Sequence, residues 1–495
     1  MSFRDATVVI IETARTVVRA GLGLHELLKT PSVEIPARVG LRRSASTSEV
    51  TQNGTDTGAS SSRATSLPQT SIPGVSVHDY LVGSQLDEAL ASGQDIIVSW
   101  PFADGGIRDW TQAEAIWKYI LFTSLQRKRV QNESPVLLSI PAGLSREVYE
   151  QICQIFFERF NVAGFGVLER PMAQIYATIS LSGVVVDVDY NHTDITPVYE
   201  GFIIHSGTLT TSIGINDCQR YLANLLKSNQ SVMTAISPPE SPLEPDALDS
   251  TLLAFVEQIW KDGYIKVPSD GETAMIEDDG ITDIAAIVVA GKEKAVIESG
   301  MKKKQSQKQT AEQQARAREI ETMDLITVQF KGQSIVLGKE RHRFCEPLFD
   351  PTLMGKGDHS NPSVLYLSLQ EAVARAIRQA DVDQRQYIWQ GVVVTGDLTK
   401  NVKGLAIALQ SRLAPYVVNP ELQTDIQPRA IRLLNVPDYY PEYRDTGEGY
   451  AAFLGSSIVA KLTFINDPNA KNFVSKGDYS QKGPRSIVEM SPALL

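Results

Sequence analysis

Apolar residues recur at helical spacing in three segments of the chain, residues 111–125, 145–160 and 368–380. An apolar stripe every three to four positions is typical of an amphipathic helix that buries one face. The first segment opens with Thr111 and, three residues later, Glu114. This spacing predicts a capping box, in which each side chain bonds the backbone amide of the other residue.

Strands are predicted by a different pattern, short apolar runs bounded by polar turns. Residues Val8–Gly23 and Ser182–Phe202 each form an apolar run, a polar turn and a second apolar run, and residues 391–399 begin with another buried-type strand. Helices and strands alternate between them, which is typical of an α/β protein. Because each hairpin heads its own α/β segment, we expect a duplicated architecture with a cleft between the halves, where ligands bind in such folds.

Two segments interrupt this pattern. Ser44–Pro73 is rich in Ser and Thr and almost free of apolar residues, so we expect a disordered insertion. Ser231–Arg318 is predicted to be a second insertion with an acidic start, one apolar stretch and a long charged end. That end contains Lys302–Lys304, a basic cluster that is compatible with nuclear import and also with ordinary solvated surface.

The composition narrows the functional class. With 495 residues, of which 42% are hydrophobic, the chain can bury a large core. Its net charge of -11 argues against a dominant contact with nucleic-acid phosphates, and no apolar run reaches the length of a membrane span. Cys153, Cys218 and Cys345 form no CxxC pair, and the six histidines form no HExxH pair. We therefore expect buried free thiols and no metal site.

An ordered set of motifs resembles actin and the actin-related proteins. In chain order these are VVRAGL, EIPARVG, WPFADGGIRDWTQAEAIWKYIL, ERPMAQIYA, VVVDVDYN, PVYEGF, VLGKERHRF, GVVVTGDLT and FLGSSIVAKL. No single motif is specific, but their order and spacing cover most of the chain. Within the family, the N-terminal region and the long charged insertion are most similar to an actin-related subunit of the SWI/SNF and RSC chromatin remodellers.

The resemblance implies an α/β chain with the actin/Hsp70-like ATPase fold, in which two duplicated lobes surround a cleft. Residues 1–180 would form the first lobe and residues 181–495 the second, with a C-terminal segment at about 450–495 returning to the first lobe. Members of the family grip the phosphates of ATP with backbone amides in glycine-containing hairpin turns. Glycine is required there because a Cβ would block the close approach.

In the first turn the resemblance implies a damaged phosphate site. Glu12 stands where the family has the aspartate on the metal side, and Arg15 stands at the serine position. Ala14 and Thr16 replace the glycines.

The second and third turns depart from the family pattern as well. Asp187 is kept, but Asp189 and Asn191 replace glycines of the second turn. In the third turn Gly396 is kept and Asp397 replaces the second glycine.

The positions that orient the attacking water are also changed. The resemblance places Arg170 at the family's glutamine and Asp194 at its histidine. Arg cannot accept a proton from water, and Asp adds negative charge beside phosphate. Losing two or three phosphate bonds of roughly 1.5–3 kcal/mol each lowers affinity about a thousandfold or more. We therefore expect no cofactor, with ATP binding possible but disfavoured, and no ATP hydrolysis.

Two interpretations of the charged cleft residues remain open. Arg15 or Arg170 could pair with phosphate, since the guanidinium fork suits that geometry. We favour the alternative, in which Glu12, Arg15, Arg170 and Asp187 form an ion-pair cluster that replaces the nucleotide and joins the lobes.

The family resemblance further implies a groove at the base of the molecule that receives an amphipathic helix. The matching positions are Tyr176, Ala177, Leu181, Ile458, Val459 and Leu462. Any of these residues could instead be ordinary core at helical spacing. The implied partners are another actin-related protein, a helix of the remodeller ATPase subunit and other remodeller subunits, without direct contact to nucleic acid or membrane.

The resulting hypothesis is a nuclear, non-catalytic scaffold subunit of a chromatin remodeller. Two alternatives come from the same family: a cytoskeletal filament-end subunit of the dynactin type, and an active actin-type ATPase. Partner identity separates the hypothesis from the first alternative, and nucleotide binding separates it from the second.

Overall fold

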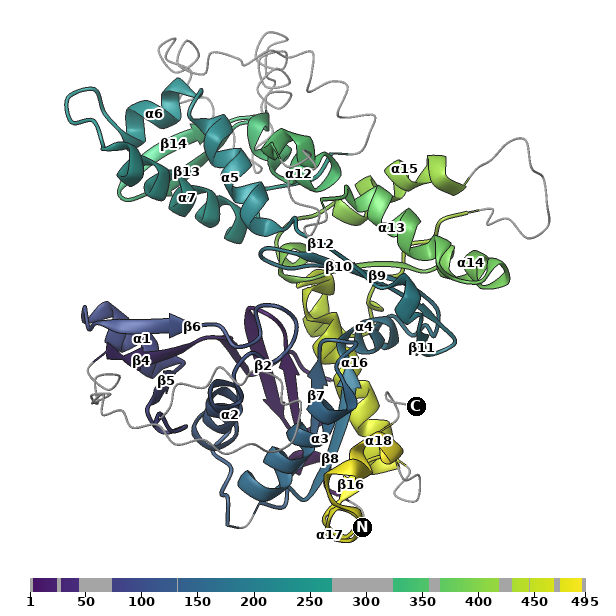
Figure 1. The fold of residues 1–495 in the computed structure, drawn as a ribbon. Coiled ribbons are helices and arrows are strands. Elements are labelled where there is room, and N and C mark those ends of the chain that lie inside the picture. Colours follow the sequence, from purple (N-terminus) through teal and green to yellow (C-terminus); the bar gives the residue numbers. More distant parts are fainter. Residues whose placement is uncertain are drawn as a thin grey trace, which may run out of the picture.

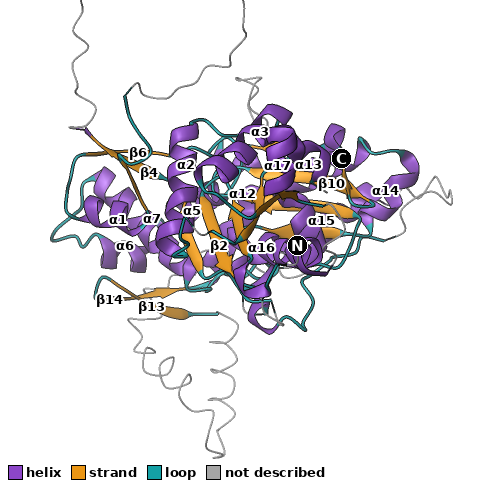
Figure 2. Ribbon diagram, turned by 90° about the horizontal axis from the view of Figure 1, so that it is seen from below, coloured by secondary structure: helices purple, strands orange, loops and turns teal. Residues whose placement is uncertain are grey.

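Two α/β lobes lie one above the other in the computed structural model (Figure 1). The structure describes residues 3–24, 28–43, 74–130, 132–268, 324–355, 366–417, 430–444, 446–466 and 472–491. Figure 2, viewed from below, shows β2 and β10 in the middle of the molecule with helices around them, while β4, β6, β13 and β14 lie toward its edge. This is the layered arrangement expected of an α/β protein.

The first lobe is built on a six-stranded sheet in the order β16-β8-β7-β1-β2-β3, counted over the described residues. Strands β1, β7 and β8 are parallel, and β2 returns antiparallel to β1 as the predicted hairpin. A smaller sheet has the order β5-β4-β6. The strands are β1 (Val9–Thr13), β2 (Val17–Leu22), β3 (Val33–Pro36), β4 (Val39–Arg42), β5 (Tyr80–Val82), β6 (Ile96–Ser99), β7 (Pro135–Ile140), β8 (Gly164–Glu169) and β16 (Val474–Ser475).

The second lobe repeats the same pairing. Strands β9 and β10 form the other predicted hairpin, and β15 lies parallel to β9 as β7 lies parallel to β1. The strands are β9 (Gly183–Val188), β10 (Thr193–Tyr199), β11 (Phe202–Ile203), β12 (Leu209–Thr211), β13 (Ile326–Phe330), β14 (Gln333–Leu337) and β15 (Val392–Thr395). The duplication predicted from the two hairpins is therefore present in the sheets.

The helices cover both sheets and include all three predicted segments. The second and third segments begin as helices at Arg146 and Leu369, one residue after the predicted starts. The first and second segments end in π-helical turns at Tyr119–Ser124 and Ile155–Arg159. The helices are α1 (Ser84–Ala91), α2 (Trp110–Lys118), α3 (Arg146–Gln154), α4 (Arg170–Ala177), α5 (Ile215–Leu226), α6 (Gln230–Ile236), α7 (Pro245–Lys261), α12 (Glu346–Phe349), α13 (Leu369–Arg378), α14 (Val382–Trp389), α15 (Leu405–Val417), α16 (Ala451–Lys461), α17 (Lys476–Lys482) and α18 (Ser486–Met490).

The predicted capping box at the start of α2 is wrong. The N-cap is Asp109, two residues before Thr111, and its side chain accepts bonds from the backbone amides of Thr111 and Gln112. A carboxylate two residues before Thr111 satisfies the free amides of the first turn, so the Thr111 hydroxyl is not needed.

Buried side chains of the described residues form three clusters, one in each lobe and one between them. The third cluster contains α4 and α16, which cross so closely that a Cβ on Gly455 would lie 1.7 Å from the carbonyl oxygen of Ala173. Near the end of the chain, β16 pairs with β8, so this segment lies against the first lobe. The three cysteines are free and buried, as predicted.

The apolar stretch predicted within Ser231–Arg318 is helical and packed. It forms helix α7, whose Leu252, Phe255, Val256 and Ile259 are fully buried in the core of the second lobe. An apolar face of this size is a packed element of the lobe. The remainder, including Lys302–Lys304, and the predicted disordered segment Ser44–Pro73 lie outside the described residues.

Candidate functional site in the cleft between the lobes

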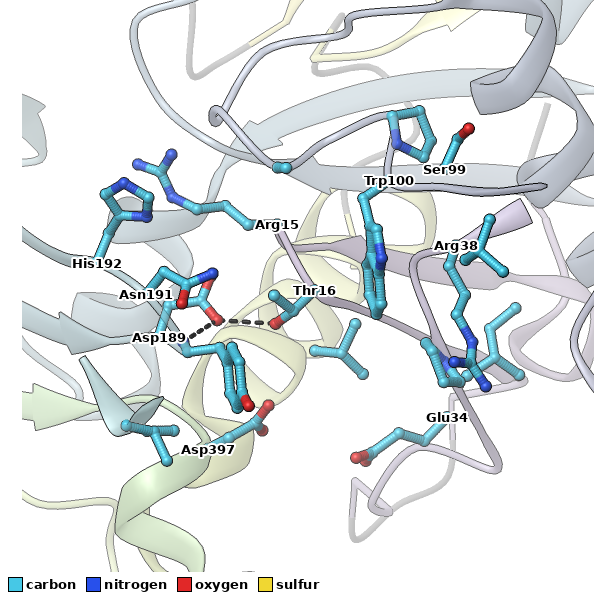
Figure 3. A pocket seen from close by; sticks show the side chains of 18 of the residues that line it. Arg15, Thr16, Glu34, Arg38, Ser99, Trp100, Asp189, Asn191, His192 and Asp397 are labelled. Atoms are coloured by element: carbon cyan, nitrogen blue, oxygen red, sulfur yellow. Dashed lines mark hydrogen bonds between the residues drawn. The ribbon is translucent and has the colours of Figure 1, made fainter. Parts of the chain in front are cut away.

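The two hairpin turns are bonded directly to each other by side chains. The Thr16 hydroxyl donates to Asp189 Oδ1 at 2.8 Å, as Figure 3 shows. Arg15 Nη2 donates to both carboxylate oxygens of Asp194 at 2.7 Å, so its guanidinium holds that carboxylate in a bidentate pair. We call these two interactions the lobe contacts, since Arg15 and Thr16 belong to the first lobe and their partners to the second.

Neither turn has the backbone conformation that requires glycine. No residue with positive φ occurs at residues 14–16 or 189–192, all of which are described. The Ala14 amide is bonded to the Val17 carbonyl at 2.9 Å, and the Asp189 amide to the His192 carbonyl at 2.9 Å. Ordinary L residues therefore form both bends, and these two amides serve the hairpins themselves.

Deeper in the cleft, Arg19 of β2 is almost fully buried among carboxylates. Its side chain is 1% exposed and pairs with Glu12 at 3.1 Å, with Glu34 at 3.2 Å and with Asp397 of the second lobe. Lys400 completes this group, because its Nζ contacts Glu34 at 2.9 Å and Asp397 at 3.1 Å. Arg19 is thus the central cation of the cleft.

Arg170, the first residue of α4, connects the same group to the second sheet. It pairs with Glu12 at 3.1 Å and with Asp187, which also accepts a bond from Gln174 at 2.9 Å. We refer to all these ion pairs together, including Arg15 with Asp194, as the cleft network. Four ion pairs of the network join the two predicted lobes: Arg15 with Asp194, Arg19 with Asp397, Arg170 with Asp187 and Lys400 with Glu34. The other four lie within one lobe.

The ion pairs predicted among Glu12, Arg170 and Asp187 are present, whereas Arg15 joins the cleft network through Asp194, which is not among the four predicted residues. Arg15 pairs with Asp194 because its turn points toward β10, where Asp194 lies, and its guanidinium rests against Gly105. A Cβ on Gly105 would lie 2.6 Å from Arg15 Nη1. Asp397 is part of the network, while Asn191 accepts a bond from Asn216 instead.

Sequence reasoning missed Arg19, Glu34 and Lys400. The signal for Arg19 was present, since a cation within the apolar strand VVRAGL must find partners when that strand is buried. Glu34 follows from Arg19 through strand pairing, because β2 and β3 place the two residues directly opposite each other. Nothing in the sequence pattern identified Lys400.

The charges of the network shift several pKa values. Burial acts to raise the pKa of Asp397, but Arg19 and Lys400 outweigh it and hold the pKa below its ordinary value. The same balance of burial against Arg19 and Lys400 lowers the pKa of Glu34. Asp189 behaves differently: burial, reinforced by the nearby charge of Asp187, raises its pKa to about 6.

The shift at Asp189 predicts a stability that depends on pH. Because its folded-state pKa lies above the ordinary carboxyl value of about 4, ionising Asp189 costs stability as the pH rises toward about 6, and the loss is complete above that pH. Asp189→Asn keeps an oxygen that can accept from Thr16 but does not ionise. We expect the melting temperature of this variant, relative to the unchanged chain, to increase from pH 5 to pH 7.5. Asp95→Asn, at an exposed position, serves as the control.

Two cavities adjoin the lobe contacts. The larger has a volume of about 1100 Å³ and is lined by Trp100 of the first lobe and by Tyr190 and Trp260 of the second. Figure 3 shows Trp100 and Asp189 among the residues that line it. The smaller, of about 310 Å³, is lined by Arg15 and Arg170 together with three aspartates, Asp104, Asp187 and Asp194. Within the described residues, no group of three or more His, Cys, Asp or Glu side chains could hold a metal ion.

Comparison with known proteins decides the family. The sequence profile of the family described as Actin matches residues 3–491 of the chain. The chain belongs to the actin family. The predicted fold class is confirmed by this match, which spans both lobes.

Among its relatives in the actin family, the chain is similar to the SWI/SNF and RSC complexes subunit arp9 of Schizosaccharomyces pombe. The two are 27% identical over 98% of this chain and 99% of that protein. Actin-related protein 7 of Arabidopsis thaliana is 25% identical over 82% of this chain and 88% of its own length. Actin-related protein 2 of Saccharomyces cerevisiae is 23% identical over 84% and 86%.

The positions predicted for the base groove lie at the C-terminal ends of α4 and α16. Leu181 and Leu462 are largely exposed, at 58% and 55%, and Tyr176 and Ile458 are half-buried. Ala177 and Val459 face the core instead. We keep the term base groove for Tyr176, Leu181, Ile458 and Leu462.

Ala177 and Val459 therefore expose little surface for the predicted partner contact, which stays a prediction. Both side chains are buried in the cluster that contains α4 and α16. Ile179, which sequence reasoning did not include, is also exposed, at 60%. In the described part of the chain, no helix is long and apolar enough to span a membrane.

Proposed function

We propose that this chain is a non-catalytic, actin-related scaffold subunit of a nuclear chromatin-remodelling complex. The observation that carries the proposal is the pair of lobe contacts, which join the two hairpin turns by side chains where relatives with glycine turns hold phosphates. The similarity to the arp9 subunit over almost the full length of both chains supports membership in a remodeller.

The cleft is a poor fit for a triphosphate with its metal ion. A phosphate entering between the turns would have to displace Thr16 from Asp189 and Arg15 from Asp194. Acidic side chains also outnumber the cations there, so an added anion meets net repulsion. The acids are Glu12, Glu34, Asp187, Asp189, Asp194 and Asp397, and the cations are Arg15, Arg19, Arg170 and Lys400.

Catalysis would fail even with nucleotide present. Arg170 is held by Glu12 and Asp187, and Asp194 is held by Arg15, so neither side chain is available to orient a water. Phosphoryl transfer in the family depends on such positioning. In our proposal ATP hydrolysis and DNA translocation belong to the ATPase subunit of the complex.

The base groove is the proposed site for a helix of that ATPase subunit. Leu181 and Leu462 are exposed apolar side chains, and Tyr176 and Ile458 are half-buried. An amphipathic helix laid on such a surface buries its apolar face and leaves its polar face in water. A second actin-related protein would bind the same helix next to this chain.

Copurification tests the proposal directly. A tagged full-length chain expressed in its own cells should recover a remodeller ATPase and another actin-related protein, identified by mass spectrometry. Leu181→Asp combined with Leu462→Asp should reduce this recovery about tenfold or more, since charge in a desolvated interface is strongly unfavourable. Leu353→Asp, at another exposed leucine, provides the matched control.

Two results would contradict the proposal. Recovery of cytoskeletal motor or dynactin subunits in place of remodeller subunits would favour the filament-end alternative. Equal recovery with both sets of leucine variants would remove the base groove from the interface.

A further inference from the structure

The two helices that form the base groove begin at the cleft network. Helix α4 starts with Arg170, which is paired with Glu12 and Asp187, and ends at Ala177 next to the groove. Helix α16 follows Tyr450, whose ring lies 4.2 Å from Lys400 Nζ and 5.2 Å from the guanidinium carbon of Arg19. Each helix therefore links the network at one end to the groove at the other.

One side of the groove, at the end of α16, is packed against elements of the first lobe. Gly455 of α16 packs directly on the α4 backbone, and a Cβ on Gly21 of β2 would lie 2.7 Å from Phe453 Cζ. Contacts this close leave no room for α16 to slide along either element. Leu462, which directly follows α16, is positioned accordingly by the first sheet and α4.

The other side of the groove belongs to the second lobe. The Leu181 carbonyl accepts a bond from the Gly201 amide at 2.8 Å, and the Ser182 hydroxyl accepts one from the Glu200 amide at 2.9 Å. These bonds attach Leu181 to the base of the β9–β10 hairpin. The other end of the same hairpin carries Asp189 and Asp194, the second-lobe partners of the lobe contacts.

We propose that the lobe contacts, Arg15 with Asp194 and Thr16 with Asp189, fix the geometry of the base groove at the opposite end of the β9–β10 hairpin. This inference rests on the proposed function, in which the groove receives a helix. The contacts hold the hairpin against the first lobe, and the hairpin holds Leu181 at a set distance from Leu462. The groove is thus pre-organised for its partner by the chain's own side chains, which lowers the ordering cost of binding.

Hydrogen exchange on the purified full chain tests the inference without any partner. The double variant Arg15→Met and Thr16→Val removes both lobe contacts, because neither new side chain can donate a hydrogen bond. We expect amide exchange to become about tenfold faster in segments 176–182 and 458–466, because exchange reports local opening of packed structure. Arg43→Gln, which removes an exposed ion pair with Asp95 in the first lobe, should leave both segments unchanged.

Faster exchange confined to the two turns, residues 13–17 and 188–195, would overturn the inference. Copurification of the same double variant gives an independent second measurement, and we expect recovery of the ATPase subunit to fall. If the unchanged chain recovers no remodeller subunits, the proposed function fails, whereas full recovery by the double variant refutes only the role of the lobe contacts. Circular dichroism of the double variant establishes that it remains folded.

Discussion

Replacing Arg19 with Met is expected to lower the free energy of unfolding by about 3 kcal/mol. The guanidinium is 1% exposed and pairs with Glu12, Glu34 and Asp397, so its loss leaves the buried Glu12 and two partly exposed carboxylates without their main cation. Breaking a buried ion pair costs about 3–5 kcal/mol. We expect the low end of this range because Arg170 still pairs with Glu12, and Lys400 with Asp397. Denaturation by urea measures the change.

Three further variants separate the charge effect from packing. Arg43→Met removes a cation whose side chain is 66% exposed, and its cost should stay below about 0.5 kcal/mol. Arg19→Lys keeps the positive charge but loses the planar guanidinium. Its stability cost should lie between those of Arg43→Met and Arg19→Met. Adding Glu12→Gln to Arg19→Met should recover part of the lost stability, as a double-mutant cycle would show. Equal, small effects at Arg19 and Arg43 would mean that the network does not stabilise the fold.

Magnesium ATP at about 1 mM should give no saturable binding to the purified chain, and no phosphate release. Two or three missing phosphate bonds of roughly 1.5–3 kcal/mol each weaken binding about a thousandfold or more relative to a member with glycine turns. The lobe contacts add to this loss, since both must break before phosphate can enter. Isothermal titration calorimetry measures binding, with actin as the positive control.

A dissociation constant in the micromolar range would contradict this expectation. It would require Arg15 or Arg170 to leave its carboxylate and pair with phosphate, the alternative that the sequence left open. Steady phosphate release at the rate of actin would refute the non-catalytic assignment as well. We also expect the melting temperature of this chain to be the same with and without ATP. A ligand raises the melting temperature only of a folded protein to which it binds.

The fold could be predicted from the sequence because its signals are local and repeated. The hairpins at Val8–Gly23 and Ser182–Phe202 and the amphipathic helices are fixed by short-range patterns of apolar residues, and the family resemblance ordered them into lobes. The stretch that forms helix α7 was predicted to be apolar, but the sequence did not show that it packs in the core of the second lobe. Its packing depends on residues far away in the chain, and periodicity alone does not show them.

The sequence predicted which charged residues form the site better than it predicted which of them form ion pairs with one another. Positions such as Glu12 and Arg170 stand out because charges replace small or specific residues of a known motif. Which carboxylate pairs with Arg15 depends on the direction in which the turn points, and that is set by three-dimensional packing against Gly105. Arg19 was overlooked because it lies outside the turns, although its burial makes it central.

The cleft network has a consequence for how the protein responds to the state of the cell. An actin whose halves are joined by ATP senses the supply of metabolites, whereas arginine and aspartate side chains are built in at translation and are never consumed. In our proposal, in which the chain binds no ATP, a fall in cellular ATP leaves this subunit's shape unchanged. The stability of the contact between its lobes would instead depend on pH, through ionisation of the Asp189 carboxyl group. It would depend little on salt concentration, because the Arg19–Glu12 pair is shielded from solvent.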